Sequence, residues 1–294
     1  MQRNVLVLGA SGKAGHHAAR VFGAAGWQVG RYARGTDMTA AARGCDVIVN
    51  GLNPPDYHAW DRLIPEITAS VIAAARASGA TVIIPGNVYN FGADGGVWSE
   101  TTPHRPNSRK GRIRVEMEAE YREAGIRTII LRAGNMIDPE VPGCVMRRVI
   151  LKDIAKGRIT APGRRDVVQP WAYVPDWARA ALGLAQIRDD LKPFEDVPFP
   201  GHNFSLEDLR AGLTAQLGRP LRFAHFPWWA LRATAPVWEL ARELLEMRYL
   251  WDLPHSLDGR RLAQLLPGFR PSPLAEVFAA GLPATLRPAP ARAA

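Results

Sequence analysis

The chain has 294 residues, 47% of them hydrophobic, so it can bury a large core in one big domain or in a large and a small one. No apolar run approaches the roughly 20 residues of a membrane helix, the first residues show no secretory pattern, and the basic residues behind the net charge of +9 are scattered rather than clustered. Cys45 and Cys144 offer no disulfide framework, and neither they nor the seven histidines show metal-ligand spacing. We therefore expect a cytoplasmic protein with no nucleic-acid partner, no membrane partner and no metal site.

The first half of the chain alternates between predicted strands and helices. Residues 5–8 form a short apolar run that ends in glycine, which is typical of a buried parallel strand. Further strands are expected at 27–31, 46–50, 81–84 and 128–131, and helices at 14–25, 60–78 and 112–124. This alternation predicts βαβ units and an α/β fold with a doubly wound parallel sheet of the Rossmann type.

One connection in this pattern is unusually short. Only about a dozen residues separate the end of the second strand, near Arg34, from the next strand at Asp46. A crossover helix with an additional strand needs more room than this. We therefore expect the edge strand of the sheet to be missing or reduced.

The composition changes after Asp138, where proline, tryptophan and longer loops become more frequent. We expect a dinucleotide-binding domain over 1–138, with a returning segment near 165–190, and a mainly substrate-binding or cap domain over 139–285. Ser205 is expected to cap a helix in that second domain. Residues 286–294, rich in Pro, Ala and Arg, are expected to form a disordered tail.

The segment 227–251 is amphipathic and rich in tryptophan. Its arginines and tryptophans would suit a helix lying in a membrane interface. Glu239, Glu243, Glu246 and Pro236 instead favour a packed lid or cap.

A glycine-rich loop joins the first strand to the first helix. Glycines in this context let the main chain approach a pyrophosphate, while backbone N–H groups at the helix N-terminus bind it. The alternative interpretation is a tight turn without a ligand. The expected cofactor contacts of this loop are Gly9, Ser11, Gly12, Lys13, Ala14 and Gly15.

The tip of the second strand indicates which dinucleotide binds. An NAD site typically places an acid there, whereas an arginine accommodates the 2′-phosphate of NADP. Residues 28–34 contain no acid, so Arg34 is the first choice for the phosphate and Arg31 the second. Asp37 lies a little beyond and is the NAD alternative. We therefore predict NADP.

Several motifs of the chain resemble those of one protein family. They are Gly9-x-x-Gly12-x-x-Gly15, the segment 44–50, Val88-Tyr89, the segment 131–135 and the segment 173–179. Together, from Val5 to about Phe278, they resemble the extended short-chain dehydrogenase/reductase superfamily, which includes NAD(P)-dependent epimerases and dehydratases. The resemblance implies a Rossmann domain with a small C-terminal substrate domain, oxidoreductase chemistry, and a homodimer formed by the helices at 60–78 and 112–124.

The chain departs from that family at the catalytic residues. The family uses a Tyr-x-x-x-Lys pair with a serine, and no Tyr-x-x-x-Lys occurs here. One alignment puts Lys110, Arg114 and Glu118 at the Tyr, the Lys and a trailing acid, and a shift by two puts Ser108, Arg112 and Glu116 there. The serine after the fourth strand is replaced by the segment 85–87, Pro-Gly-Asn.

Replacement roles can be suggested for residues near the expected strand ends. Lys110, if desolvated beside arginines and the nicotinamide, could act as the acid/base, or it could be a phosphate or surface charge. Tyr89 is a second proton donor or a packing residue. The remaining candidates, each with a structural alternative, are Asn53, Pro85 and Gly86 for the cofactor, Asn135, Trp171 and Tyr173 for the substrate, and the Trp228-Trp229 pair for an apolar pocket.

Two functions remain open at this point. The first is an NADP-dependent oxidoreductase or epimerase-like enzyme that acts on a small carbonyl or sugar-type substrate with a non-standard acid/base group. The second is a non-catalytic NAD(P)-binding sensor or regulatory protein. The missing pair favours the sensor, and the aromatic residues expected in the substrate domain favour the enzyme.

Overall fold

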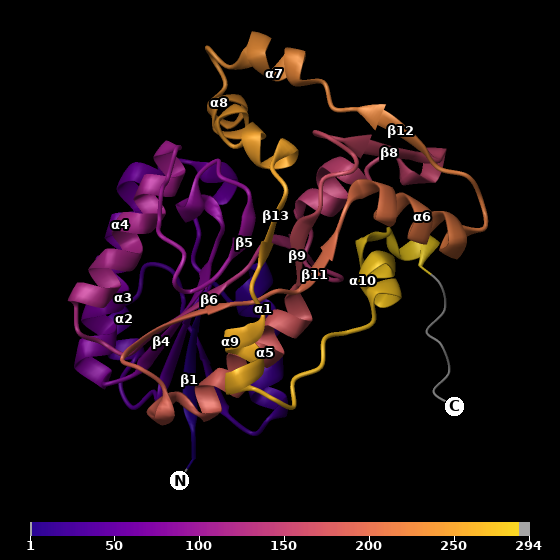
Figure 1. The fold of residues 1–294 in the computed structure, drawn as a ribbon. Coiled ribbons are helices and arrows are strands. Elements are labelled where there is room, and N and C mark those ends of the chain that lie inside the picture. The colour runs from indigo at the N-terminus through magenta and orange to yellow at the C-terminus, as the bar shows by residue number, and fades with distance from the viewer. Residues whose placement is uncertain (1, 288–294) are drawn as a thin grey trace, which may run out of the picture.

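A parallel sheet forms the centre of the computed structural model, which describes residues 2–287 (Figure 1). Six strands lie in the order β10-β6-β4-β3-β1-β2, and every neighbouring pair is parallel. These strands are β1 (Asn4–Leu8), β2 (Gln28–Arg31), β3 (Val47–Asn50), β4 (Thr81–Gly86), β6 (Thr128–Arg132) and β10 (Phe194–Pro198). The predicted doubly wound α/β fold is confirmed.

Helices cover both faces of this sheet (Figure 1). On one face, α1, α5 and α9 pack into a core with Val5, Val7 and Ile83. On the other face, α2, α3 and α4 pack against Leu6, Leu8 and Ile84. The alternation of side chains along β1 sends odd and even residues into the two separate cores. The helices are α1 (Lys13–Ala24), α2 (Met38–Ala41), α3 (Trp60–Ser78), α4 (Arg109–Glu123), α5 (Val174–Gln186) and α9 (Arg260–Leu265).

The sheet ends at β2, as the short connection predicted. Within residues 2–287, β2 has β1 as its one neighbouring strand. The chain between β2 and β3 contains only the four-residue helix α2, which Asp37 caps by accepting from the N–H groups of Thr39 and Ala40. The reduced edge of the sheet is therefore confirmed.

A second lobe carries its own hydrophobic core. The residues of this core come from the segment 137–286 and include Trp171, Phe204, Leu209 and Phe278. Ser205 caps α6, as expected. Its hydroxyl accepts from the N–H of Asp208, and the Asp208 carboxylate accepts from the N–H of Ser205. The lobe and its connections contain β7 (Asn135–Ile137), β8 (Arg158–Ala161), β9 (Gln169–Tyr173), β11 (His202–Phe204), β12 (Arg222–His225), β13 (His255–Leu257), α6 (Leu206–Leu217), α7 (Trp228–Thr234), α8 (Glu239–Glu246) and α10 (Leu274–Gly281).

Small sheets join the segments of this lobe. Strands β7, β9 and β11 form one sheet, and β8 pairs with β12. Strand β13 pairs with β5 (Gly96–Trp98), which follows β4 in the chain and so ties the C-terminal part to the first domain. No helix in the described part of the chain is long and apolar enough to cross a bilayer.

The return of the chain to the main sheet is longer than expected. Helix α5 falls within the expected returning segment near 165–190, but β10 and α9 also pack on the sheet beyond it. The expected tail begins at 286, yet Leu286 still belongs to a 3₁₀ turn and Arg287 donates to the carbonyl of Pro139. The rest of that tail, 288–294, lies outside the described residues.

Candidate functional site

The three glycines of the first loop have different local roles. Gly9 has φ +71°, and a Cβ there would lie 2.8 Å from the carbonyl oxygen of Gly51. A Cβ at Gly15 would lie 2.2 Å from the carbonyl oxygen of Gly9, so α1 packs on the loop only without a side chain. At Gly12 the nearest atom would be the Gly9 oxygen at 3.3 Å, and the loop otherwise leaves this position open. The first and third glycines thus shape the turn, and the second allows close approach from outside.

The N-terminus of α1 is free to bind an anion. Gly12 is its N-cap, so no side chain accepts hydrogen bonds from the first-turn N–H groups, and no acid lies in that turn. Ser11 is exposed and Lys13 is half-buried at the same end of the helix. Aligned peptide dipoles and unpaired N–H groups make such an end suitable for a pyrophosphate. These residues fit a dinucleotide.

Basic side chains follow the neighbouring strand β2. Arg31 and Arg34 are exposed, and among residues 2–287 neither has an acidic oxygen within 4.0 Å. Asp37, the alternative ribose ligand, accepts two backbone bonds as the cap of α2. The tip of β2 therefore offers uncompensated positive charge, while Oδ1 of Asp37 is used as a helix cap.

The buried positions on α4 coincide with one of the two alignments of the missing pair. Lys110, Arg114 and Glu118 are all buried, whereas Arg112 and Glu116 are exposed. Ser108 is the N-cap of α4, where its hydroxyl accepts from the N–H of Gly111 at 3.0 Å. Only the first alignment directs its three side chains inward.

Lys110 does not have the surroundings that we expected. Its side chain is fully buried and bonds to the carboxylates of Glu243 and Glu246 on α8, instead of facing arginines. The alternative of a surface charge is wrong, because no part of Lys110 is exposed. Lys110 thus fixes α8 over the start of α4 (Figure 1).

Other acids of α8 contribute to the same attachment. Glu243 also accepts from Arg109 at 2.5 Å, and Glu239 contacts His58 Nδ1 at 2.7 Å and the N–H of Ala59 at 3.2 Å. Although burial opposes ionisation, the bonds from Lys110 lower the pKa of Glu246. These glutamates therefore pack α8 against the first domain, and the role of the segment as a lid stays a prediction.

A strained loop after β3 places a tyrosine at the same edge of the sheet. Asp56, Tyr57 and Ala59 have φ values of 51°, 64° and 45°, which non-glycine residues rarely adopt. The Tyr57 hydroxyl lies 3.2 Å from the Tyr89 hydroxyl, and Lys110 Nζ lies 5.2 Å from the Tyr57 ring centre. Sequence reasoning missed Tyr57, although its position in the loop after a buried strand was a signal.

The electrostatics of this tyrosine pair follow from burial and from Arg114. Burial raises the pKa of Tyr89, and the neighbouring Tyr89 together with burial holds the pKa of Tyr57 well above its usual value. The Arg114 guanidinium opposes both shifts, and burial lowers the pKa of Arg114 itself. Both hydroxyls therefore keep their protons at neutral pH, beside a buried cation.

The remaining expected cofactor residues lie at the carboxyl ends of β3 and β4. Asn53 Oδ1 accepts from Arg114 Nη2 at 2.7 Å, which links the loop after β3 to α4. Gly86 has no room for a side chain, because a Cβ would lie 2.5 Å from Ile130. Pro85 precedes it at the end of β4, half-buried. Their location is the one at which open parallel sheets bind ligands.

Two of the expected substrate residues belong instead to the core of the second lobe. Trp171 is 2% exposed and stacks on Phe204 with ring centres 5.1 Å apart. Tyr173 is buried with its hydroxyl 3.4 Å from Glu276. Both therefore pack the core of the second lobe, and a role toward a substrate stays a prediction. Asn135 is half-buried and donates to Gln169 at 3.2 Å.

A cavity of about 600 Å³ lies elsewhere in this lobe. Trp228 lines it and donates to the carbonyl of Pro162 at 2.6 Å, whereas Trp229 is 74% exposed and points to solvent. The arginines of this cavity were missed, although the run Gly163-Arg164-Arg165 was a signal. The lining residues that can recognise a ligand are Arg164, Arg165, Arg248, His225, Phe226 and Trp228, accompanied by Asp166, Glu207 and Asp252.

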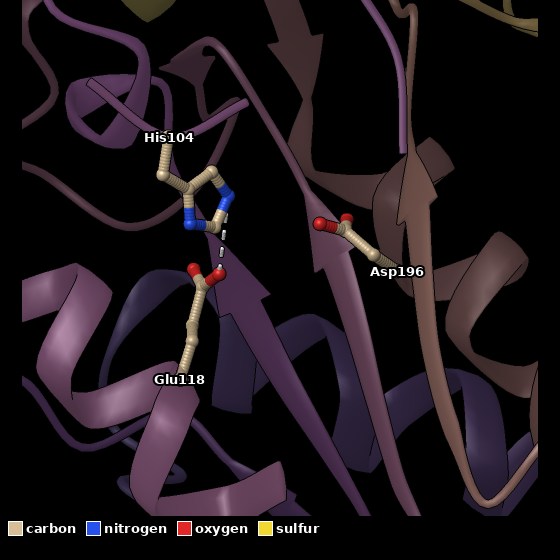
Figure 2. A group of neighbouring side chains, drawn as sticks. All are labelled: His104, Glu118 and Asp196. Atoms are coloured by element: carbon tan, nitrogen blue, oxygen red, sulfur yellow. Dashed lines mark ion pairs between the residues drawn. The ribbon is translucent and has the colours of Figure 1, made fainter. Parts of the chain in front are cut away.

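One group of side chains has the composition of a metal site. The ligand atoms of His104, Glu118 and Asp196 lie within 4.8 Å of one another (Figure 2). The fully buried guanidinium of Arg132, however, bonds to Glu118 at 2.8 Å and to Asp196 at 2.5 Å. A cation would have to displace this arginine. We therefore assign the group as an ion-pair network that joins α4, β6 and β10.

Comparisons with known proteins agree with the fold. No family model and no curated protein matches the sequence. Among solved structures, MoeE5 in complex with UDP-glucuronic acid and NAD is 16% identical with a TM-score of 0.75, covering 94% of this chain and 97% of that one. A putative epimerase from Burkholderia cenocepacia is 19% identical with a TM-score of 0.74, covering 94% and 95%.

A further similar structure, like that of MoeE5, was solved with NAD. The UDP-glucuronic acid 4-epimerase of Bacillus cereus in complex with NAD is 15% identical with a TM-score of 0.74, covering 94% of this chain and 96% of that one. The descriptions of these complexes name NAD and not NADP. At these identities the likeness concerns the fold. The chain therefore shares its fold with these solved structures, two of which contain NAD.

Proposed function

We propose that this protein is a nicotinamide-dinucleotide-dependent enzyme of the epimerase or oxidoreductase kind. The observation that carries the proposal is the free N-terminus of α1 behind the open position at Gly12. It supports binding of a pyrophosphate by backbone N–H groups. Tyr57 and Tyr89 follow the carboxyl ends of the neighbouring strands β3 and β4, where a reacting group would meet the cofactor, and Arg114 lies near them on α4.

The cavity in the second lobe supports an anionic substrate with a planar group. Arg164 pairs with Asp166 at 2.6 Å, but among residues 2–287 Arg165 and Arg248 have no acidic partner and supply positive charge, and Phe226 and Trp228 supply flat apolar surface. A nucleotide-activated sugar has both a diphosphate and a base, and MoeE5 has been solved with UDP-glucose as well as with UDP-glucuronic acid. We therefore propose a sugar nucleotide as the substrate class, which narrows the expected carbonyl or sugar-type substrate.

Tyr89 is the better of the two proposed proton-transfer residues. Lys110 is enclosed by the carboxylates of α8, whereas the Tyr89 hydroxyl contacts another hydroxyl and is near Arg114. The bound dinucleotide would exchange hydride with the substrate. Tyr89 would donate a proton to the substrate oxygen or accept one from it, and Tyr57 would orient the Tyr89 hydroxyl. Arg114 would stabilise negative charge on the substrate oxygen or on the Tyr89 oxygen.

Replacing Tyr89 with phenylalanine tests this role. We expect kcat to fall at least about 100-fold, because general acid–base catalysis contributes that much, while the Kd for the dinucleotide stays the same. The measurement is turnover of a panel of UDP-sugars, by NAD(P)H absorbance for net oxidation or reduction and by chromatography of the products for epimerisation. Tyr173→Phe is the control, since its hydroxyl contacts Glu276 in the core of the second lobe. Unchanged kcat in Tyr89→Phe would remove Tyr89 from the mechanism.

The choice between NADP and NAD is tested at the tip of β2. We propose NADP because Arg34 and Arg31 are uncompensated and Asp37 is occupied as a cap, although the similar structures name NAD. Arg34→Ala should weaken NADPH binding about tenfold or more and leave NADH binding unchanged, because only NADPH carries the 2′-phosphate. Isothermal titration of both cofactors measures this, with exposed Arg43→Ala as the control. Tighter binding of NADH by the unaltered protein would overturn the assignment.

The alternative, a dinucleotide-binding sensor, has one observation in its favour. Helix α8 bonds to the position that the family's tyrosine would occupy. A sensor would bind the dinucleotide tightly and turn over no member of the substrate panel, whereas the enzyme would turn over at least one.

A further inference from the structure

The turn between α7 and α8 exposes apolar side chains at the edge of the molecule. Its residues 235–238 are Ala-Pro-Val-Trp, with no polar side chain, although turns in solvent usually contain Asn, Asp, Ser or Gly. Val237 is 90% exposed and Trp238 is 46% exposed, and Trp229 on the adjoining helix is 74% exposed. Figure 1 shows α7 at the periphery, away from the main sheet.

The charges of this segment are separated between its two sides. Glu239, Glu243 and Glu246 all bond inward, to His58, Arg109 and Lys110. Arg232 and Arg242 are exposed, and among residues 2–287 neither forms an ion pair with an acid. The outer tip, which we define as Trp229, Arg232, Val237, Trp238 and Arg242, therefore presents apolar and cationic side chains, and the half-exposed Glu239 next to it is paired with His58.

This separation removes the argument against a membrane contact. The three glutamates favoured a packed lid over an interfacial helix, because acids on an outer face would repel anionic lipid. The structure satisfies them on the inner side, so the same segment packs against the first domain on one side and presents tryptophan and arginine on the other. Tryptophan prefers the headgroup region of a bilayer, and arginine attracts anionic lipid.

The charge of the outer tip also decides between candidate occupants. A symmetric dimer would bring the same patch of two copies together, and its arginines would then face arginines. An anionic surface has the opposite charge, and a bilayer accepts tryptophan and valine without a preformed groove. Since no helix of the described part can cross a membrane, the contact would be peripheral.

We propose that the outer tip binds the surface of an anionic lipid membrane. The proposal is independent of the catalytic function, because no residue of the outer tip lies among the cofactor, cavity or tyrosine residues described above.

Co-sedimentation of the full chain with sucrose-loaded vesicles tests it. We expect binding to phosphatidylcholine vesicles with 30% phosphatidylglycerol, little binding to pure phosphatidylcholine, and loss of binding as salt rises from about 0.1 to 0.5 M. Trp229→Ala/Trp238→Ala should weaken binding at least about tenfold through lost apolar contact. Arg232→Glu/Arg242→Glu should weaken it at least as much, since each arginine near the surface is worth about fivefold.

Matched variants distinguish vesicle binding by the outer tip from binding caused by the net positive charge of the whole chain. Arg43→Glu/Arg105→Glu makes the same change in net charge at exposed residues elsewhere, and Val97→Ala/Leu274→Ala removes apolar side chains that are 65% and 40% exposed. Circular-dichroism melts show whether each variant is folded. Absence of lipid-dependent binding would overturn the proposal, as would equal losses in the matched variants. A dimer that the tip variants dissociate, without vesicle binding, would overturn it in favour of a second copy.

Discussion

Replacing Arg132 with methionine is expected to lower the free energy of unfolding by about 3–5 kcal/mol at neutral pH. The Arg132 side chain is fully buried and bonds to Glu118 and Asp196 through two pairs of hydrogen bonds. Methionine fills a similar space but leaves both carboxylates without their cation. Urea unfolding followed by circular dichroism measures the change.

The pH dependence of this loss distinguishes charge from packing. Burial already raises the pKa of Asp196, with Arg132 opposing the rise, so removal of Arg132 should raise that pKa further. A group whose folded pKa is raised destabilises the fold as pH rises through that pKa. The difference between Arg132→Met and the unaltered protein should therefore be larger at pH 8 than at pH 5.

An exposed arginine provides the control for this experiment. Arg62→Met removes an exposed pair with Glu66 one helical turn away and should cost less than about 0.5 kcal/mol. A loss for Arg132→Met that is equally small, or that is independent of pH, would contradict the assignment of this group as a structural ion-pair network.

Alanine at Gly15 and at Gly12 should separate folding from cofactor binding. At Gly15 the added Cβ meets backbone at 2.2 Å, so Gly15→Ala should destabilise the protein by about 3 kcal/mol or more. At Gly12 the nearest atom, the carbonyl oxygen of Gly9, is at 3.3 Å, a tight contact that needs only a small shift, so Gly12→Ala should cost much less stability than Gly15→Ala. Its methyl group should nevertheless weaken dinucleotide binding at least about tenfold, because the backbone can no longer approach the pyrophosphate.

Gly23 is the matched control within the same helix. Its added Cβ would lie 3.7 Å from Val29, an ordinary contact, so Gly23→Ala should leave binding unchanged and leave stability equal or slightly higher. Thermal melts and NAD(P)H titration give both quantities. Full dinucleotide affinity in Gly12→Ala would show that the loop does not bind the pyrophosphate.

The strand of the main sheet that sequence reasoning missed, β10, has side chains that form specific distant contacts. Strand β10 contains Glu195 and Asp196, which do not resemble a strand of a buried sheet. Each acid is satisfied by an arginine far away in sequence, Arg261 for Glu195 and Arg132 for Asp196. Hydrophobic pattern cannot indicate such a strand, because its stability in the sheet depends on partners that only the fold supplies.

In the candidate site, too, features set by local sequence could be predicted, and contacts between distant residues could not. The glycine loop, the arginines after β2 and the reduced edge of the sheet depend on local geometry and on chain length, and the sequence by itself determined them. Tyr57 beside Tyr89, and the enclosure of Lys110 by Glu243 and Glu246, are contacts across 32, 133 and 136 residues of chain. Lys110 looked like a candidate catalyst because its charge and position were visible and its partners were not. Only the tertiary structure decided its role, since the environment of a buried charge is set by which distant groups the fold brings to it.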